Sequence, residues 1–127
     1  MKYTAAINFI RLFEFIRTRP FDSAWRQVGL DDDDLRGLEY ELCAAPKKGP
    51  AIRGIGGLRK LRVAIRTGQG KSGGGRVGYA FFEAYGVILL AAFYPKNQRE
   101  NLTVEQERKI ELQLRGLEGY LRGREKR

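Results

Sequence analysis

The sequence predicts an α+β domain in which an antiparallel sheet of about four strands packs against two N-terminal helices and one C-terminal helix. Its 127 residues fit one domain of ordinary size, 1–127, with a basic tail at 122–127. Apolar residues with helical spacing appear on both sides of a central region that has the pattern of consecutive strands. Apolar residues make up 43% of the chain, which is enough to bury a core.

The first expected elements are a short strand and a short helix. Residues 12–16 have the composition of a strand, although a helix is also compatible with them. Asp22 or Ser23 is the expected N-cap of a helix that carries Trp25. Gly29 is the expected end of this helix, because glycine suits the position that follows a helix.

A second helix is expected over about 32–45. The acidic run 31–34 complements the positive end of a helix dipole, and Leu35, Leu38 and Leu42 recur on one helical face. The same run lacks the spaced ligands of a metal site. Capping and solvation explain it better, and no metal site is expected.

Three strands are expected next, over 58–66, 76–84 and 87–94, as an antiparallel meander with a tight turn at Gly86. The third of these strands is almost wholly apolar, as is typical of a central strand. The first alternates between an apolar and a cationic face, with Leu61, Val63 and Ile65 on one side and Lys60, Arg62 and Arg66 on the other.

The last expected element is an amphipathic helix. Thr103 and Gln106 have the spacing of a capping box, which indicates where the helix begins. Its apolar face is expected to consist of Ile110, Leu114, Leu117 and Leu121.

The charge of the chain is strongly uneven. The formal net charge is +9, and no acidic residue lies between Glu41 and Glu83. Such an excess favours polyanionic partners. The chain has no histidine, which excludes imidazole acid/base catalysis and nearly all zinc sites, so any chemistry falls to Lys, Arg, Tyr or carboxylates. The cations of the acid-free region are Lys47, Lys48, Arg53, Arg59, Lys60, Arg62, Arg66, Lys71 and Arg76.

Cysteine usage and hydropathy indicate the compartment. Cys43 is the single cysteine, and it falls in an apolar helical stretch where a buried thiol is the ordinary outcome. Residues 1–20 carry scattered charges, unlike a signal peptide, and the longest uncharged stretch, 86–95, is too short to span a bilayer. We therefore expect a cytoplasmic protein with no membrane partner.

Two glycine motifs do not predict a cofactor. Gly68, Gly70 and Gly73 match a dinucleotide-binding spacing, but a strand follows where that motif needs a helix. Residues 70–72 match the last residues of a phosphate-binding loop motif, but Ile65 stands where the first glycine of that motif is required. A hairpin connection explains this segment better, and no cofactor is expected.

Three blocks of the sequence follow one another in a characteristic order: Gly-Gly-Leu-Arg-Lys-Leu-Arg-Val at 56–63, then 71–79, then Tyr-Pro-Lys-Asn at 94–97. This order resembles the HigB-like toxins of the RelE superfamily, over about 13–121. The resemblance implies a compact α+β fold whose cationic concave sheet face holds RNA, and cleavage of mRNA, usually in the ribosomal A site. It also implies a cognate antitoxin, typically a helix-turn-helix HigA-like protein, through which the complex binds operator DNA.

The resemblance also implies site residues. Lys60, Arg62, Arg76 and Lys96 match the family's catalytic positions, whereas Asn97 stands where some members carry arginine and Pro95 replaces a common glycine. Tyr94 and Tyr120 are the candidates for a base-stacking tyrosine, with core packing as the alternative for each. The RNA contacts that we expect are Arg59, Arg66, Lys71, Tyr94, Asn97 and Arg99.

These residue types suit RNA cleavage by attack of the 2′-hydroxyl on the adjacent phosphate. Arg62 and Arg76 could stabilise charge on the phosphoryl oxygens, because a planar guanidinium matches phosphate geometry. Lys60 or Lys96 could act as base or acid if neighbouring cations favour the neutral amine. A non-catalytic RNA- or ribosome-binding domain is the alternative, and a DNA-binding regulator is disfavoured because no helix-turn-helix pattern is found.

Overall fold

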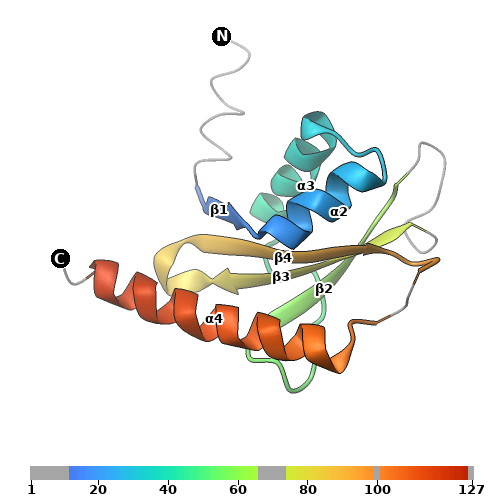
Figure 1. The fold of residues 1–127 in the computed structure, drawn as a ribbon. Coiled ribbons are helices and arrows are strands. Elements are labelled where there is room, and N and C mark those ends of the chain that lie inside the picture. The colour runs from blue at the N-terminus through green and yellow to red at the C-terminus, as the bar shows by residue number, and fades with distance from the viewer. Residues whose placement is uncertain (1–11, 66–73, 99–100, 126–127) are drawn as a thin grey trace, which may run out of the picture.

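The computed structural model describes residues 12–65, 74–98 and 101–125. The candidate residues Arg66, Lys71 and Arg99 lie outside these ranges. Figure 1 shows the helices and strands in their order along the chain: β1 (Glu14–Arg17), α2 (Arg19–Gln27), α3 (Asp32–Ala44), β2 (Leu58–Val63), β3 (Gly75–Phe82), the 3₁₀ turn η2 (Glu83–Tyr85), β4 (Val87–Pro95) and α4 (Val104–Glu125).

The four strands form one sheet in the order β1-β4-β3-β2. The strands β2, β3 and β4 make the predicted antiparallel meander, and the α+β class with two N-terminal helices and one C-terminal helix is confirmed. One detail differs from the sequence prediction, because β1 pairs parallel with β4, Glu14 opposite Val87. The long connection through α2, α3, β2 and β3 allows this parallel arrangement, which a tight hairpin would not.

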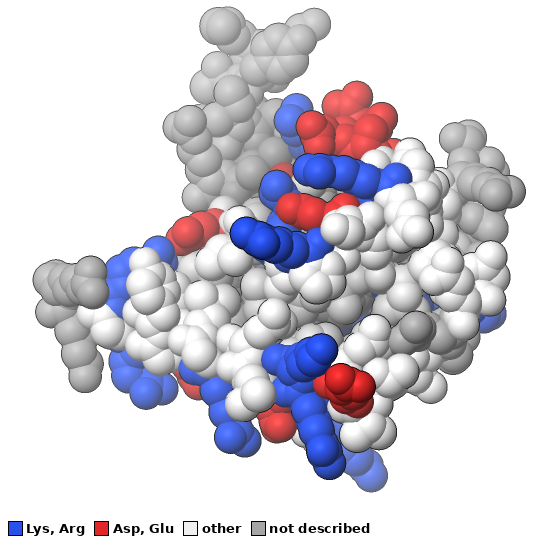
Figure 2. All heavy atoms as spheres, viewed as in Figure 1, with Lys and Arg blue, Asp and Glu red and all other residues white. Residues whose placement is uncertain are grey.

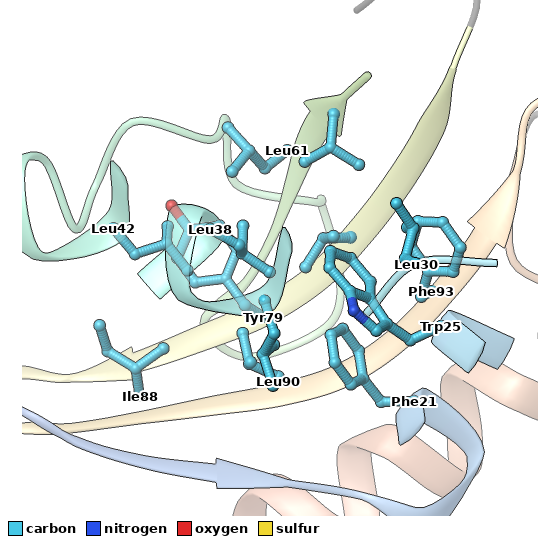
Figure 3. Close-up of a cluster of buried hydrophobic side chains, with 13 residues drawn as sticks. Phe21, Trp25, Leu30, Leu38, Leu42, Leu61, Tyr79, Ile88, Leu90 and Phe93 are labelled. Atoms are coloured by element: carbon cyan, nitrogen blue, oxygen red, sulfur yellow. The ribbon is translucent and has the colours of Figure 1, made fainter. Parts of the chain in front are cut away.

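Helices cover both faces of the sheet, with α2 and α3 on one face and α4 on the other (Figure 1). On the α2/α3 side, the rings of Phe21 and Trp25 stack with their centroids 5.4 Å apart, and Trp25 meets Phe93 of β4 edge to face at 5.1 Å. Figure 3 shows these rings converging with leucines from α3 on the sheet. A second cluster lies under α4 and includes Leu58, Ala80, Leu89, Ala91, Ile110 and Leu114.

The start of α2 corrects a sequence prediction. Its N-cap is Thr18, whose hydroxyl accepts a hydrogen bond from the Phe21 amide, rather than Asp22 or Ser23. Pro20 fits the first turn because proline has no amide hydrogen to leave unsatisfied there. The Asp22 carboxylate instead accepts from Arg17 Nε at 2.7 Å, and this pair lies at the surface.

The caps predicted for the other helices are confirmed. Asp31 and Asp34 form a reciprocal capping box at the start of α3, each with a hydrogen bond of 2.9 Å. Thr103 and Gln106 form the equivalent pair before α4 at 3.0 and 3.1 Å. These bonds satisfy amide hydrogens that have no partner within the helix. The acidic run at 31–34 thus caps a helix, as expected.

The loop between α3 and β2 is held by a buried tyrosine. The Tyr79 hydroxyl donates to the Pro46 carbonyl at 2.8 Å and accepts from the Gly49 amide at 3.0 Å. Burial raises the pKa of this phenol, so it stays a neutral donor. Beside it, a Cβ on Gly49 would lie 2.8 Å from the Lys60 carbonyl oxygen, so this position requires glycine. These contacts hold the loop after α3 against the sheet beside β2.

Candidate functional site

The cationic side of β2 faces α4. Leu58 packs in the cluster under α4, whereas Leu61 and Val63 pack against α2 and α3. Because side chains alternate along a strand, Lys60 and Arg62 share the face of Leu58. We call this the α4-side face. The apolar residues of α4 pack against Leu58 and its neighbours, so α4 covers the beginning of β2, whereas Arg62 near the end of β2 is exposed.

Three strands align their side chains in rows on the α4-side face. Arg62 is the cross-strand partner of Arg76 on β3, and Arg76 is the partner of Tyr94 on β4. The adjacent row consists of Lys60, Gly78 and Ala92. We call the first the arginine row and the second the lysine row. The structure therefore brings Lys60, Arg62, Arg76 and Tyr94 together on one face of the sheet.

The members of the arginine row differ in exposure. Arg62 is exposed, Arg76 is 1% exposed and Tyr94 is 7% exposed. One Nη atom of Arg76 donates to the neighbouring Gly75 carbonyl at 3.1 Å. Solvent therefore reaches the guanidinium of Arg62 while that of Arg76 lies within the protein. The small exposed fraction of Tyr94 favours the packing alternative for this ring over stacking on a base.

Apart from Lys60, the lysine row contains only the small residues Gly78 and Ala92. Gly78 is the cross-strand partner of Lys60, and a Cβ there would lie 3.6 Å from the Ala92 Cβ and 3.8 Å from Leu58. These are ordinary contact distances, so the fold does not require glycine at this position. Gly78 leaves the aliphatic stem of Lys60 without a cross-strand neighbour on this side.

The tip of Lys60 meets a residue that the sequence did not single out. Its Nζ donates to the Oδ1 of Asn101 at 3.0 Å, across 41 positions in the chain. Asn101 lies in the connection between β4 and α4, immediately before Leu102 and the capping residue Thr103. No sequence signal distinguishes this asparagine from other polar loop residues, because its partner comes from a distant strand.

Lys96 and Asn97 lie at the end of β4, and both are exposed. The Lys96 amide donates to the Gly74 carbonyl at 3.0 Å, and the preceding Pro95 pairs with Gly75. Both residues therefore lie at the same end of the sheet as the arginine row. Tyr120, the other stacking candidate, is 58% exposed on α4 and lies near Arg124, 5.8 Å from the guanidinium carbon to the ring centre.

Arg59 lies apart from this set. It alternates with Lys60, so it belongs to the opposite face, and its guanidinium donates to the carbonyls of Lys47 and Gly49 at 3.1 and 2.8 Å. Lys47 pairs with Glu83 at 2.9 Å and Lys48 pairs with Glu41 at 2.6 Å. Some cations of the acid-free region thus bind oxygen atoms of the protein itself.

The α4-side face differs in charge from the surface of α4 itself. Figure 2 shows Lys and Arg side chains interspersed with acidic ones along that helix. Three ion pairs with helical spacing lie there, with N to O distances of 3.7 to 3.9 Å, and exposed pairs of this kind contribute little to stability. The rows on β2 and β3 contain cations without acidic residues among them.

A cavity of about 480 Å³ lies elsewhere, between η2, the middle of α4 and the loop before β2. Its lining includes Tyr85, Glu111 and Glu118 and none of the candidate residues. Within the described ranges, no group of histidine, cysteine or acidic side chains could hold a metal ion, and no helix is long and apolar enough to cross a membrane. Cys43 is buried, and burial raises the pKa of its thiol.

The fold of this chain is similar to that of a solved structure. The E. coli toxin RelE, an arginine double mutant in the free state, superposes with a TM-score of 0.50 at 16% identity, covering 69% of this chain and 87% of that chain. The protein has a RelE-like fold. No family model matches the chain. In this RelE-like fold, Lys60, Arg62, Arg76 and Tyr94 lie on the sheet face that also carries the C-terminal helix.

Proposed function

We propose that this protein is a ribonuclease toxin of the RelE type, which cleaves mRNA in the ribosomal A site. The observation that carries the proposal is the placement of Lys60, Arg62 and Arg76 on one face of the sheet, in a RelE-like fold. Like charges on one face repel one another, so a polyanion is the natural occupant of such a surface. The closer likeness to HigB-like members rests on the sequence blocks at 56–63 and 94–97.

The chemistry is attack of the ribose 2′-hydroxyl on the adjacent phosphate. The reaction forms a 2′,3′-cyclic phosphate and releases a 5′-hydroxyl, so one proton leaves the nucleophile and another reaches the leaving oxygen. The exposed guanidinium of Arg62 binds the phosphoryl oxygens and stabilises the charge that develops on them. The amine of Lys60, one row away, transfers a proton. Lys96 is the second candidate for that role.

Arg76 has a different part in this proposal. Its side chain is 1% exposed, so it does not meet the phosphate directly in the present conformation. As the cross-strand partner of Arg62, it adds positive potential beneath the phosphate from a region of low dielectric constant. Tyr94, the next member of the row, is 7% exposed and is the cross-strand partner of Arg76 on β4.

The same proposal implies specific partners. A ribonuclease that acts on translation would poison its host, so a cognate antitoxin must neutralise it. We propose a helix-turn-helix antitoxin of the HigA type, which brings the complex to operator DNA. The ribosome orients the message, and this positioning lets a small set of Lys and Arg side chains suffice.

Growth under tight induction tests this function. Wild type is compared with Lys60→Ala/Arg62→Ala, and primer extension on a reporter mRNA locates cleavage. Arg108→Ala/Lys109→Ala removes the same two charges from the exposed face of α4 and serves as the matched control. We expect growth arrest and in-frame cuts for wild type and control, and neither for the Lys60/Arg62 variant. Normal growth and intact mRNA with folded wild-type protein would contradict the proposal.

The second candidate is a non-catalytic RNA- or ribosome-binding domain. The burial of Arg76 favours it, because one exposed guanidinium beside a lysine suffices for phosphate contacts without catalysis. This candidate predicts salt-dependent RNA binding by wild type without strand scission. Cleavage that disappears in Lys60→Ala while RNA affinity changes less than about tenfold would exclude it.

A further inference from the structure

We propose that Asn101 is a positioning residue for Lys60, which holds the amine in place for proton transfer. This inference rests on the proposed function and extends it to a residue outside the catalytic set. The contact joins β2 to the connection that leads into α4, with 3.0 Å between Lys60 Nζ and Asn101 Oδ1.

Both ends of the Lys60 side chain are fixed by this arrangement. At its base, the Lys60 amide donates to the Pro50 carbonyl at 3.0 Å, so the backbone of β2 is paired on its outer edge. Along its stem, the cross-strand partner Gly78 provides no side chain to restrain it. A lysine side chain has large rotamer freedom. The hydrogen bond to Asn101 supplies the restraint that the lysine row lacks.

The residues directly after Asn101 are anchored at the start of α4. Leu102 packs against the cluster under α4, and the Thr103 hydroxyl accepts from the Gln106 amide at 3.1 Å. The backbone that leads from Asn101 into α4 is thus anchored, through the cluster with Leu58 and Ala80, to the same sheet that carries Lys60.

A neutral amide suits this task better than a carboxylate. Its oxygen accepts a hydrogen bond from either protonation state of an amine, so it fixes the position of Lys60 without forcing the charged form. A carboxylate at the same distance would favour the ammonium and oppose proton release. Among the described residues, the charged or titratable residues in the neighbouring rows are Arg62 of β2, Arg76 of β3 and Tyr94 of β4, Lys96 follows at the end of β4, and Glu105 and Glu107 lie in the first turn of α4.

The experiment measures single-turnover cleavage of ribosome-bound mRNA over a range of pH. Asn101→Leu keeps the approximate shape and removes the acceptor, and Asn101→Asp keeps the acceptor and adds charge. Each change is also made in the Lys60→Ala background, where single-turnover reactions are followed long enough to measure a residual rate that the growth assay does not detect. Gln98→Leu, in the exposed turn after β4, is the matched control. Circular dichroism checks that each variant is folded.

We expect Asn101→Leu to lower the rate about tenfold to a hundredfold, as for a misplaced catalytic group, and to have less than about a twofold effect once Lys60 is absent. Asn101→Asp should move the pH of half-maximal rate upward by about one unit, because the added charge favours the ammonium. Gln98→Leu should match wild type.

Equal losses with and without Lys60, together with an unshifted pH profile in Asn101→Asp, would overturn the positioning role. In that case cleavage by wild type would still stand and only this inference would fail. Absence of cleavage by folded wild-type protein on ribosomes would instead refute the proposed function, and the inference with it.

Discussion

Arg62 and Arg76 are direct cross-strand partners on the α4-side face, yet Arg62 is exposed and Arg76 retains 1% of its accessible surface. Two guanidinium groups on opposite strands repel each other, and an anion bound between or above them relieves the repulsion. The same pair therefore has two separable contributions. Under the proposed function, the exposed Arg62 would contact the anion, and the buried Arg76 would contribute to the local potential and to the packing of the sheet.

Arg62→Ala should weaken RNA binding without affecting the fold. The side chain is exposed, so we expect the free energy of unfolding to change by less than about 0.5 kcal/mol. Loss of one phosphate contact should reduce the slope of log affinity against log salt by about one. Fluorescence anisotropy with a labelled RNA over a salt series measures it. Arg108→Ala is the control, and an equal effect in both variants would show that only net charge matters.

Arg76→Ala should destabilise the protein. Truncating a large, fully buried side chain leaves a cavity, and we expect a loss of about 2–5 kcal/mol in the free energy of unfolding. Urea denaturation followed by circular dichroism measures the change. Arg76→Met retains most of the volume and should lose less. If Arg76→Ala were as stable as wild type, the arginine would not be part of the core packing.

Tyr79→Phe should lower the free energy of unfolding by about 1–3 kcal/mol, because it leaves the Pro46 carbonyl and the Gly49 amide without their shared hydrogen-bond partner. The pH dependence adds a second test. Burial raises the pKa of Tyr79 above its ordinary value of 10.0, so its contribution to stability is complete below about pH 10 and is lost as the pH rises through the folded value. Unfolding free energies at alkaline pH should therefore fall more steeply for wild type than for Tyr79→Phe. Parallel curves would contradict this assignment.

The glycines at and near β3 and in α4 should tolerate substitution unequally. A Cβ on Gly75 would lie 2.6 Å from the Phe93 ring and one on Gly74 would lie 2.2 Å from the Val63 carbonyl, so alanine at either site should cost about 1–3 kcal/mol. Gly78→Ala meets only ordinary contacts and should be tolerated. Gly116 lies on the exposed side of α4, and a Cβ there would meet open space. Gly116→Ala should therefore raise the free energy of unfolding by up to about 1 kcal/mol. Thermal unfolding of the four variants gives the ranking, and uniform losses would refute it.

Several features of the site could be predicted from the sequence because they depend on local rules. The alternation in β2 places Lys60 and Arg62 on one face, and the structure agrees. The same alternation separates Arg59, which we expected to contact RNA, from Lys60. The caps at Asp31 and Thr103 could be predicted because their side chains bond within four residues.

The sequence by itself determined the helices, the meander and the cationic face of β2, because periodicity and capping act over a few residues. The tertiary structure alone decided the parallel pairing of β1, the burial of Arg76, the close packing at Gly74 and Gly75, and the contact between Lys60 and Asn101. Each of these depends on which distant segments meet across the sheet. That choice is made by the packing of whole elements around the two apolar clusters, and no local pattern encodes it.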